Sequence, residues 1–440
     1  MSDFAQDVRA RMKEDWNRRA IEDASYYVAF GRRDQDEEEF FATAREVVLS
    51  LEAEMRRLAP VANPRSRRAL EIGCGPGRLM KPLSRHFGEI HGVDVSDEMI
   101  QLARANLAGI PHAHAHASSG ADLAAFADES FDFVYSYAVF QHIPDREVIF
   151  NYLREAHRVM KDGAVFRGQF NGLPDTARVY DTWSGARIQA AEVARFALEH
   201  DFQLLALDGA STQYLWTTWR KRPAGWRRGL RERPPGAAAR IVKITNANGS
   251  EPLVPASGRF AFVSLWVSDL PDDFDLNDAE VLIGSRVAEL SYIGPPSAGG
   301  ISQVNAAVPG GTRTGLVNVE LRWLGRRIAP AAVMRVIPAG PVIPLVTSVA
   351  DGVNLLSGTR IVSGSVKVTV EEATAPVEFS AFIEGMPVRE IDIFCADPVP
   401  PRYEINFLLP KNLSAGPHTL DLMLNGRRLA PAAIEVVPRP

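Results

Sequence analysis

The residues with the clearest chemical pattern are three glycines, Gly73, Gly75 and Gly77, which follow an apolar run and precede a helical pattern. Glycine-rich turns of this kind bring the backbone close to a nucleotide cofactor, because no side chain stands in the way. Asp94 closes the next apolar run, at the distance along the chain at which a carboxylate binds a ribose diol. The dinucleotide-binding motif has a third glycine at the position where this chain has Arg78. The pattern predicts a nucleotide cofactor without deciding which one.

Apolar runs and helical patterns alternate through the first half of the chain, which is typical of an α/β fold with a mostly parallel sheet. Helices are predicted at 97–108 and 146–161. Only four residues separate the last two apolar runs, too few for a parallel crossover, so these two are expected to form an antiparallel hairpin. The predicted strands are 68–72, 89–95, 113–118, 131–137, 164–170, 202–209 and 214–220.

The second half has a different pattern. Residues 223–240 are rich in Pro, Gly and Arg and are expected to be a solvated linker. Beyond them, short alternating runs predict strands, and residues 305–333 align without a gap on residues 406–434. A period of about 100 residues fits an immunoglobulin-sized sandwich. Two tandem β-sandwich modules are therefore predicted, at 241–339 and 340–440, separable from the first half.

Four motifs resemble those of class I S-adenosylmethionine-dependent methyltransferases. "ALEIGCGPGRLM" resembles their first motif and "GVDVSDEMI" their second-strand motif. Residues 119–145 resemble the adenine loop and fourth strand, and residues 153–170 the approach to the fifth strand. The resemblance implies a Rossmann-like methyltransferase domain over 1–222, with an N-terminal helical lid and a seven-stranded sheet that ends in an antiparallel hairpin. It implies S-adenosylmethionine as the cofactor, whereas Arg78 and the hairpin disfavour a nicotinamide-dependent oxidoreductase. The two β modules resemble IPT/TIG-type immunoglobulin-like modules.

The same resemblance implies roles at the methionyl and ribose parts of the cofactor. Glu71 is placed for the ammonium group, Asp94 for both ribose hydroxyls, and a helix from about Gly77 for the carboxylate. The other residues assigned to this part of the site are Tyr27, Gly73, Cys74, Gly75 and Tyr137.

At the adenine ring, Val95 and Met99 are expected to lie on the two faces. Asp122 is expected to accept from the exocyclic amine, and the backbone at Leu123 to donate to a ring nitrogen. A helix cap is the alternative role for Asp122.

Aromatic residues of the N-terminal segment, Trp16, Tyr26 and Tyr27, are candidates to cover the sulfonium by cation–π attraction or, alternatively, to pack a helix on the sheet. His142 follows the fourth strand and is the candidate general base if the acceptor must lose a proton. A structural role for His142 stays open.

The acceptor side is expected to comprise residues 171–185 and the hairpin aromatics Tyr214, Trp216 and Trp219, which could stack a planar or sugar substrate or belong to the core. The predicted activity is transfer of a methyl group to oxygen or nitrogen of a small-molecule or glycan acceptor. The alternative is a non-catalytic cofactor-binding or scaffold protein with a methyltransferase-like domain.

Composition excludes several other classes. A formal net charge of −5 argues against a nucleic-acid partner, and no apolar run approaches the ~18 residues of a membrane span. Two distant cysteines and a charged N-terminal segment predict a cytoplasmic protein. The "HAHAH" run (His112, His114, His116) lacks further ligands, so an edge strand and no metal are expected. The β modules are candidates for homo-oligomer contacts.

Overall fold

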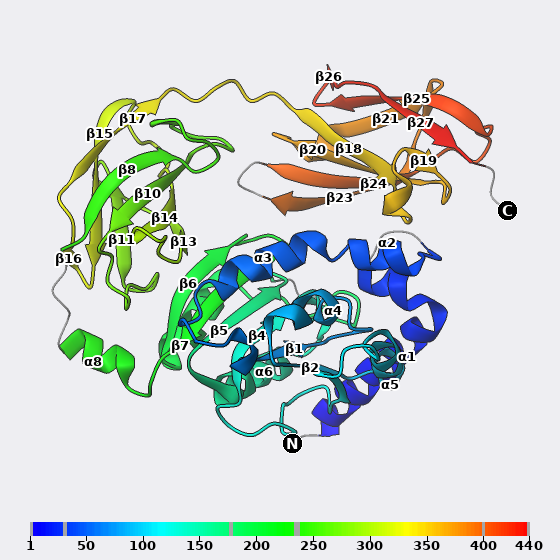
Figure 1. Cartoon of the computed structure of the whole chain (residues 1–440). Coiled ribbons are helices and arrows are strands. Elements are labelled where there is room, and N and C mark those ends of the chain that lie inside the picture. Colours follow the sequence, from blue (N-terminus) through cyan, green and yellow to red (C-terminus); the bar gives the residue numbers. More distant parts are fainter. Residues whose placement is uncertain (1–2, 30–32, 176–178, 233–237, 398–400, 438–440) are drawn as a thin grey trace. The chain divides into compact units, whose positions relative to one another are not determined.

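The computed structural model of the chain describes residues 3–29, 33–175, 179–232, 238–397 and 401–437 (Figure 1). These residues form two compact units. The first comprises the residues up to Glu22 together with Ala44–Ala339, and the second Asp23–Thr43 together with the residues from Gly340 onward. Helix α1 (Asp3–Ala29) belongs to both units, and its backbone is non-helical at Asp23. The two units are described separately below.

The first unit begins with an α/β domain whose parallel strands follow the order β3-β2-β1-β4-β5. Strands β7 and β6 continue the sheet, and β7 is antiparallel to both of its neighbours, as the four-residue connection predicts. The Rossmann-like methyltransferase order is thus present. Its strands are β1 (Arg68–Ile72), β2 (Glu89–Asp94), β3 (Ala113–Ala117), β4 (Phe131–Ser136), β5 (Met160–Phe170), β6 (Phe202–Asp208) and β7 (Leu215–Lys221).

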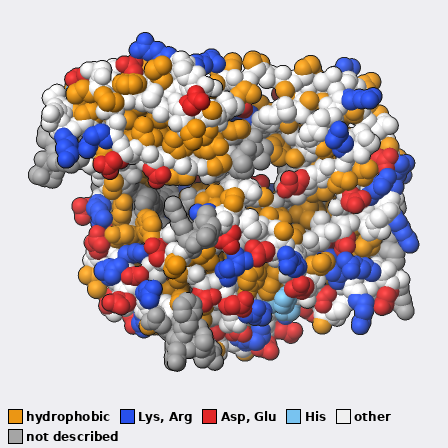
Figure 2. All heavy atoms as spheres, turned by 180° about the vertical axis from the view of Figure 1, so that it is seen from behind, with side chains coloured by type: hydrophobic (Ala, Val, Ile, Leu, Met, Phe, Trp, Pro, Cys, Tyr) orange, Lys and Arg blue, Asp and Glu red, His pale blue; other side chains and the backbone are white. Residues whose placement is uncertain are grey.

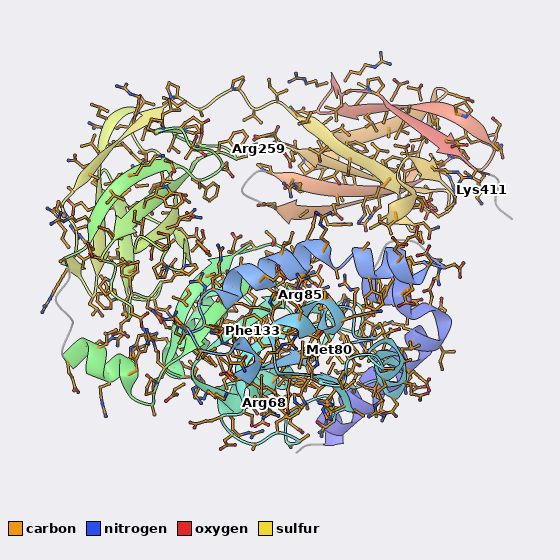
Figure 3. All side chains as sticks on the ribbon, in the orientation of Figure 1. Arg68, Met80, Arg85, Phe133, Arg259 and Lys411 are labelled. Carbon is orange, nitrogen blue, oxygen red and sulfur yellow. The ribbon has the colours of Figure 1, made fainter. Side chains whose placement is uncertain are left out.

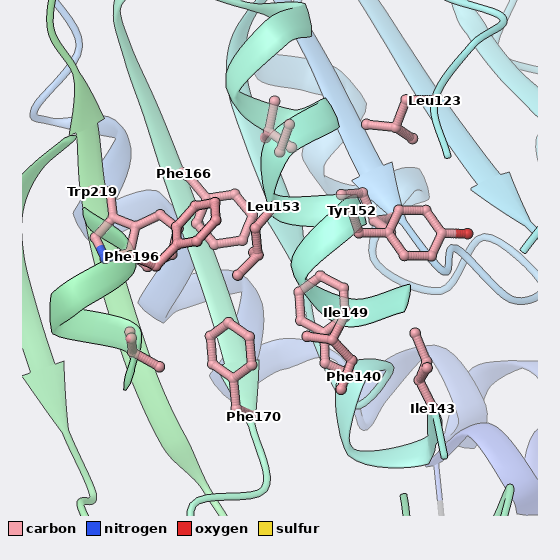
Figure 4. Close-up of a cluster of buried hydrophobic side chains, with 14 of the residues drawn as sticks. Leu123, Phe140, Ile143, Ile149, Tyr152, Leu153, Phe166, Phe170, Phe196 and Trp219 are labelled. Atoms are coloured by element: carbon pink, nitrogen blue, oxygen red, sulfur yellow. The ribbon is translucent and has the colours of Figure 1, made fainter. Parts of the chain in front are cut away.

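Helices cover both faces of this sheet. One face packs on α3, α4 and α5, where Met80 and Phe133 point into the layer between helices and strands (Figure 3). The other face packs on α6, α7 and the first turns of α1, around the aromatic cluster of Phe140, Phe166 and Trp219 (Figure 4). The helices are α2 (Glu37–Ala42), α3 (Arg45–Met55), α4 (Met80–Leu83), α5 (Asp97–Asn106), α6 (Arg146–Val159), α7 (Ala190–Glu199) and α8 (Trp226–Glu232), with short 3₁₀ turns η1 (Pro64–Ser66), η2 (Ser84–His86) and η3 (Phe140–His142).

Helix α6 illustrates why these segments are helical. The carboxylate of Asp145 caps it by accepting from the N–H of Glu147, and its buried residues recur at spacings of three and four. This stripe fills the space beside β4 and β5. The buried residues are Val148, Ile149, Tyr152, Leu153, Ala156 and Val159.

The two β modules share one topology. In the first, one sheet has the order β13-β14-β10-β8 and the other β12-β11-β15-β17-β9, with β16 paired to β15. In the second, the corresponding orders are β23-β24-β20-β18 and β22-β21-β25-β27-β19, with β26 on β25. The two sheets of each module enclose one core. The repeat seen in the sequence therefore corresponds to a repeated set of strands.

The first module consists of β8 (Arg240–Asn246), β9 (Leu253–Pro255), β10 (Phe262–Ser268), β11 (Ala279–Ile283), β12 (Arg286–Ala288), β13 (Leu290–Ile293), β14 (Ile301–Ala307), β15 (Gly315–Trp323), β16 (Arg326–Arg327) and β17 (Ala332–Ile337). The second consists of β18 (Leu345–Asp351), η4 (Leu355–Ser357), β19 (Arg360–Ile361), β20 (Ser365–Glu371), η5 (Pro376–Glu378), β21 (Phe379–Ile383), β22 (Met386–Pro387), β23 (Arg389–Asp397), β24 (Arg402–Leu408), β25 (Gly416–Leu424), β26 (Arg427–Arg428) and β27 (Ala432–Val436).

The expectation that the first sheet ends with its own hairpin is wrong. Strand β6 pairs with β13 at Ala206 and Tyr292, so the described residues form one sheet of eleven strands that runs from the α/β domain into the first module. The predicted linker also contributes to the core, because α8 lies within it and buries Arg227 and Leu230. The first module is therefore packed against the α/β domain. The boundaries at 222, 240 and 339 stay predictions.

None of the helices in the described part of the chain is long and apolar enough to cross a membrane. On the face shown in Figure 2, Lys and Arg side chains are interspersed with Asp and Glu.

Candidate active site

The glycine turn after β1 has a left-handed backbone. Gly73, Gly75 and Gly77 have φ angles of 74°, 49° and 81°, a region that side chains disfavour. The N–H of Gly73 donates to the carbonyl oxygen of Val93 at 2.8 Å, which ties the turn to β2. A Cβ on Gly73 would come within 2.2 Å of Val139 Cγ2. Only glycine fits there, so the turn keeps the bare backbone that a close cofactor contact needs.

The helix expected from about Gly77 is shorter than predicted. Residues 75–79 form turns, and the regular helix α4 comprises only Met80–Leu83. The expected start of the helix at about Gly77 is therefore wrong, and the binding of the cofactor's carboxylate by N–H groups of this segment stays a prediction. Cys74 within the turn is buried, and burial raises the pKa of its thiol well above the usual value.

Asp94 lies where β2 ends, beside the glycine turn. Its Oδ2 accepts from the N–H of Gly75 at 2.9 Å, and its Oδ1 accepts from the N–H of Ser96 at 2.9 Å. Burial raises the pKa of Asp94, and these backbone hydrogen bonds act in the opposite direction. Each carboxylate oxygen has a second lone pair. Asp94 therefore has the acceptor capacity that a ribose diol requires, next to the turn predicted to hold the same ligand.

Glu71 is more deeply buried than its predicted role suggests. Its side chain is 3% exposed, and the hydroxyl of Tyr135 donates to its Oε2 at 2.9 Å. Burial raises the pKa of Glu71 to about 8, although Tyr135 and the Arg78 guanidinium act to lower it. Burial thus favours the protonated carboxyl, whereas a bound ammonium group would favour the carboxylate form. Its contact with the cofactor stays a prediction.

Two of the residues expected at the adenine ring lie near each other along the chain and differ in exposure. Met99 is buried on α5, and its N–H donates to the hydroxyl of Ser96. Val95 is partly exposed, and a Cβ on Gly120 would come within 2.7 Å of its Cγ2. Val95 and Gly120 thus form one compact surface beside Asp94.

The remaining adenine contacts have protein partners in this structure. Asp122 accepts from the Ser119 hydroxyl at 2.7 Å and from the N–H of Ala124 at 3.1 Å, and these bonds hold a turn. Among the described residues no helix begins between β3 and β4, so the alternative role of Asp122 as a helix cap is wrong. The N–H of Leu123 donates to Glu155 Oε2 at 3.1 Å. In this structure a charge-assisted bond to α6 uses this N–H, so its predicted contact with a ring nitrogen of adenine stays a prediction.

The first part of α1 lies against the same region. The Ser96 hydroxyl donates to Asn17 Oδ1 at 2.7 Å, and Lys13 forms an ion pair with Asp97 at 2.7 Å. The segment before the first strand therefore contacts the turn that follows Asp94, as a lid would.

The loop after β5 contacts α1 from the other side. Arg19 is buried and donates to the carbonyl oxygen of Thr182 at 3.1 Å. Its guanidinium lies 4.8 Å from the ring centre of Trp16 and 5.3 Å from that of Trp183. Trp16 thus packs within a cation–π cluster between α1 and the loop after β5. Its predicted contact with the sulfonium stays a prediction.

Tyr26 and Tyr27 lie beyond the kink at Asp23 and belong to the second unit. Their rings contact each other edge to face at 5.2 Å. The predicted contact of Tyr27 with the cofactor stays a prediction.

His142 is held as a neutral imidazole with a fixed tautomer. Its Nδ1 lies 2.9 Å from the carbonyl oxygen of Trp183, so Nδ1 carries the proton. Its Nε2 lies 3.3 Å from the amide nitrogen of Gln141, whose oxygen accepts from buried Gln169 at 2.9 Å. Burial lowers the pKa of His142 to about 4. These hydrogen bonds give His142 a structural role, and its role as general base stays a prediction.

A four-member stack lies where β4 ends and β7 begins. The rings of Tyr137 and Trp216 are parallel within 9°, with centres 5.5 Å apart. The guanidinium of Arg78 lies 5.8 Å from the centre of Tyr137, and that of Arg167 lies 4.5 Å from the centre of Trp216. Of the predicted residues, Tyr137 thus contacts Arg78 of the glycine turn. Sequence reasoning missed Arg167, although a charge within the apolar run "AVFRGQF" was a signal.

The other hairpin aromatics divide between core and surface. Trp219 is fully buried and stacks on Phe166 at 5.1 Å, so it belongs to the core. Tyr214 is 45% exposed. Only Trp216 of the three joins the stack.

The "HAHAH" run forms the edge strand β3, as predicted. His114 pairs with His91 of β2, and His91 Nδ1 lies 3.1 Å from His116 Nε2, whereas His112 contacts the carbonyl oxygen of Ser84 at 3.0 Å. Within the described ranges, no group of His, Cys, Asp and Glu side chains could hold a metal ion.

Residues 70–167, less than half of the chain, match the methyltransferase domain family. The chain is 36% identical over 104 residues to a ubiquinone biosynthesis O-methyltransferase of Sinorhizobium medicae, covering 24% of this chain and 41% of that protein. It is 34% identical over 121 residues to a trans-aconitate 2-methyltransferase of Rhizobium rhizogenes, covering 27% of this chain and 43% of that protein. The chain thus spans less than half the length of these curated relatives. The bare glycine turn fits the methionyl part of S-adenosylmethionine, and the free acceptor capacity of Asp94 fits its ribose. The chain contains a methyltransferase domain, and its cofactor is S-adenosylmethionine.

Proposed function

We propose that this protein transfers a methyl group from S-adenosylmethionine to oxygen or nitrogen of a small-molecule or glycan acceptor. The single observation that carries the proposal is the joint geometry of the glycine turn and Asp94. The N–H of Gly75 donates to the carboxylate of Asp94, so two parts of the cofactor site that lie far apart in sequence are held together.

The cofactor supplies a methyl group that is activated by a cationic sulfur. The chain has to bind, orient and enclose it. Asp94 would accept from the ribose hydroxyls, the turn at Gly73 would admit the methionyl part, and Val95 would contact the adenine. Positioning of this kind can supply on the order of 7–11 kcal/mol of the barrier reduction. A base is needed only for an acceptor that loses its proton during transfer, and His142 is the candidate for it.

The β modules are proposed to be immunoglobulin-like modules of the IPT/TIG type that bind the acceptor or assemble the protein as a homo-oligomer in the cytoplasm. Their support is the shared order of strands in two sheets around one core. The names of the two relatives given above support a small organic acceptor rather than a glycan.

Calorimetric titration with S-adenosylhomocysteine tests the cofactor site. We expect Asp94→Ala to weaken binding about 10–100-fold, because charge-assisted hydrogen bonds are lost. Asp162→Ala, at an exposed position of β5, is the matched control and should leave the affinity unchanged. Equal affinities for Asp94→Ala and the unaltered chain would contradict the assignment.

Release of S-adenosylhomocysteine in an acceptor screen tests the transfer itself. Tight binding of S-adenosylmethionine without turnover on any acceptor would favour the non-catalytic alternative.

A further inference from the structure

Within the described residues, Arg167 forms neither an ion pair nor a hydrogen bond with a carboxylate. It lies on β5 between Tyr135 of β4 and Thr218 of β7. It donates from Nη1 to the Thr218 hydroxyl at 2.9 Å, and its buried Nε has no partner. The carboxylates that act on it, Glu54 and Asp208, do so through space without a hydrogen bond.

Glu54, one of these two carboxylates, is engaged elsewhere. Glu54 forms a buried ion pair with Arg57 at 2.6 Å, in which both side chains are almost inaccessible. Burial lowers the pKa of Arg167, which reflects the cost of holding a charge there. Arg167 is partly exposed, and an anion that reaches its guanidinium would complete the hydrogen bonds that Thr218 leaves open.

The stack connects Arg167 with the cofactor site. Trp216 lies between Arg167 and Tyr137, and Arg78, which follows the glycine turn directly, lies over the other face of Tyr137. Arg167 therefore lies two aromatic rings away from the turn that holds the cofactor. One small acceptor molecule would then place its methyl-accepting atom near that turn and its anionic group at Arg167.

We propose that the methyl acceptor carries an anionic group, a carboxylate or a phosphate, that binds Arg167 beside the Tyr137–Trp216 stack. This inference rests on the proposed function. The guanidinium offers two parallel donors, which match either anion, and the indole beside it limits the access of water. Arg167 is then a residue for acceptor specificity rather than for the chemical step.

Titration of the protein saturated with S-adenosylhomocysteine tests the proposal. The probes are benzoate, phenyl phosphate and benzamide, which share a ring and differ in charge. We expect at least one of the two anions to bind about tenfold or more tightly than benzamide. The tighter of the two anions identifies the group as carboxylate or phosphate.

Two variants and a control localise the effect. Arg167→Gln should reduce the affinity for the anion to that for benzamide and leave the affinity for S-adenosylhomocysteine unchanged. Arg167→Lys keeps the charge without the planar fork and should retain part of the anion affinity, which also covers the case in which Arg167→Gln does not fold. Arg195→Gln, at an exposed position of α7, should change neither affinity.

Equal binding of the anions and benzamide would overturn the proposal, as would an unchanged anion affinity in Arg167→Gln or no binding of any probe. As long as S-adenosylhomocysteine still binds, each of these results rejects the anion site at Arg167 and leaves the proposed function intact. Loss of S-adenosylhomocysteine binding by the unaltered chain would instead contradict the proposed function.

Discussion

The two β modules have the same strand order, yet among the described residues only the first forms a continuous sheet with the α/β domain. The edge strand of the first module, β13, pairs with β6 through Tyr292 and Ala206. The corresponding edge strand of the second module, β23, pairs among the described residues only with β24. The two modules thus share one topology but differ in what pairs with their edge strands.

The difference has a local cause in the segment before the fourth strand of each module. In the first module this segment reads "DDFDLND" (272–278), and one hundred residues later the second has "EATAPVE" (372–378). Asp275 is fully buried, accepts from the N–H of Leu204 and pairs with Arg227 at 3.3 Å. The position one hundred residues later is Ala375, which has no carboxylate to make such contacts.

The edge strands differ in the same sense. β13 has four residues, whereas β23 has nine, with acidic and basic side chains and two irregularities in its register. Charges and bulges on an edge strand prevent pairing with other chains. In the first module, the edge strand β13 is paired with β6. In the second module, the charged side chains and register irregularities of the edge strand β23 disfavour pairing with another strand.

Truncation should give the largest effect. A chain that ends at Lys221 loses the strand beside β6 and the buried partner of Leu204, so we expect it to aggregate or to melt more than about 10 °C lower. A chain that ends at Ala339 keeps the whole eleven-strand sheet of the described residues and should stay folded. Thermal melts of both variants decide this. A shorter chain as stable as the longer one would mean that the domains are separable after all.

Asp275→Ala should give the next largest effect. It leaves Arg227 buried with Asp278 as its remaining carboxylate, at 2.6 Å, so a loss of about 3 kcal/mol in the free energy of unfolding is expected. Glu378→Ala, in the corresponding and exposed segment of the second module, is the control and should cost less than about 0.5 kcal/mol. Urea unfolding measures both. Equal losses would contradict the distinction between the modules.

Acid should destabilise the first unit through buried histidines. Burial lowers the pKa of His157 from 6.5 to about 4. Between pH 6.5 and 4 the histidine is protonated in the unfolded chain but stays neutral in the folded chain. The contribution of His157 to the free energy of unfolding is therefore complete above pH 6.5 and is lost as the pH falls through 4. With an allowance for partial exposure, the loss is about 1–2 kcal/mol. His157→Gln should flatten the unfolding free energy between pH 6.5 and 4, and an unchanged slope would contradict this.

Asp272→Asn should give the smallest effect. Its side chain is 74% exposed, although it pairs with Arg220 at 2.9 Å and with Arg222 at 2.8 Å. Exposed pairs contribute about 0–1 kcal/mol. A loss as large as that of Asp275→Ala would show that exposed and buried contacts at this junction act as one network.

Local patterns were sufficient to predict the strands of the α/β domain, the hairpin and the internal repeat. The glycine turn and Asp94 were readable for the same reason, because a left-handed turn and a strand-end carboxylate each depend on a few consecutive residues. Glu71 and Leu123 were harder. Their surroundings come from Tyr135 and Glu155, which lie far along the chain.

The sequence by itself determined the order of elements, the left-handed glycine turn and the duplication of the β module, since each is encoded by periodicity or by residue type within a short segment. Only the tertiary structure decided that β6 pairs with β13, that Arg227 meets Asp275 and that Arg167 stacks on Trp216. These contacts join residues that are distant in sequence, and their energies depend on burial and alignment. Neither burial nor alignment exists until the sheets have packed.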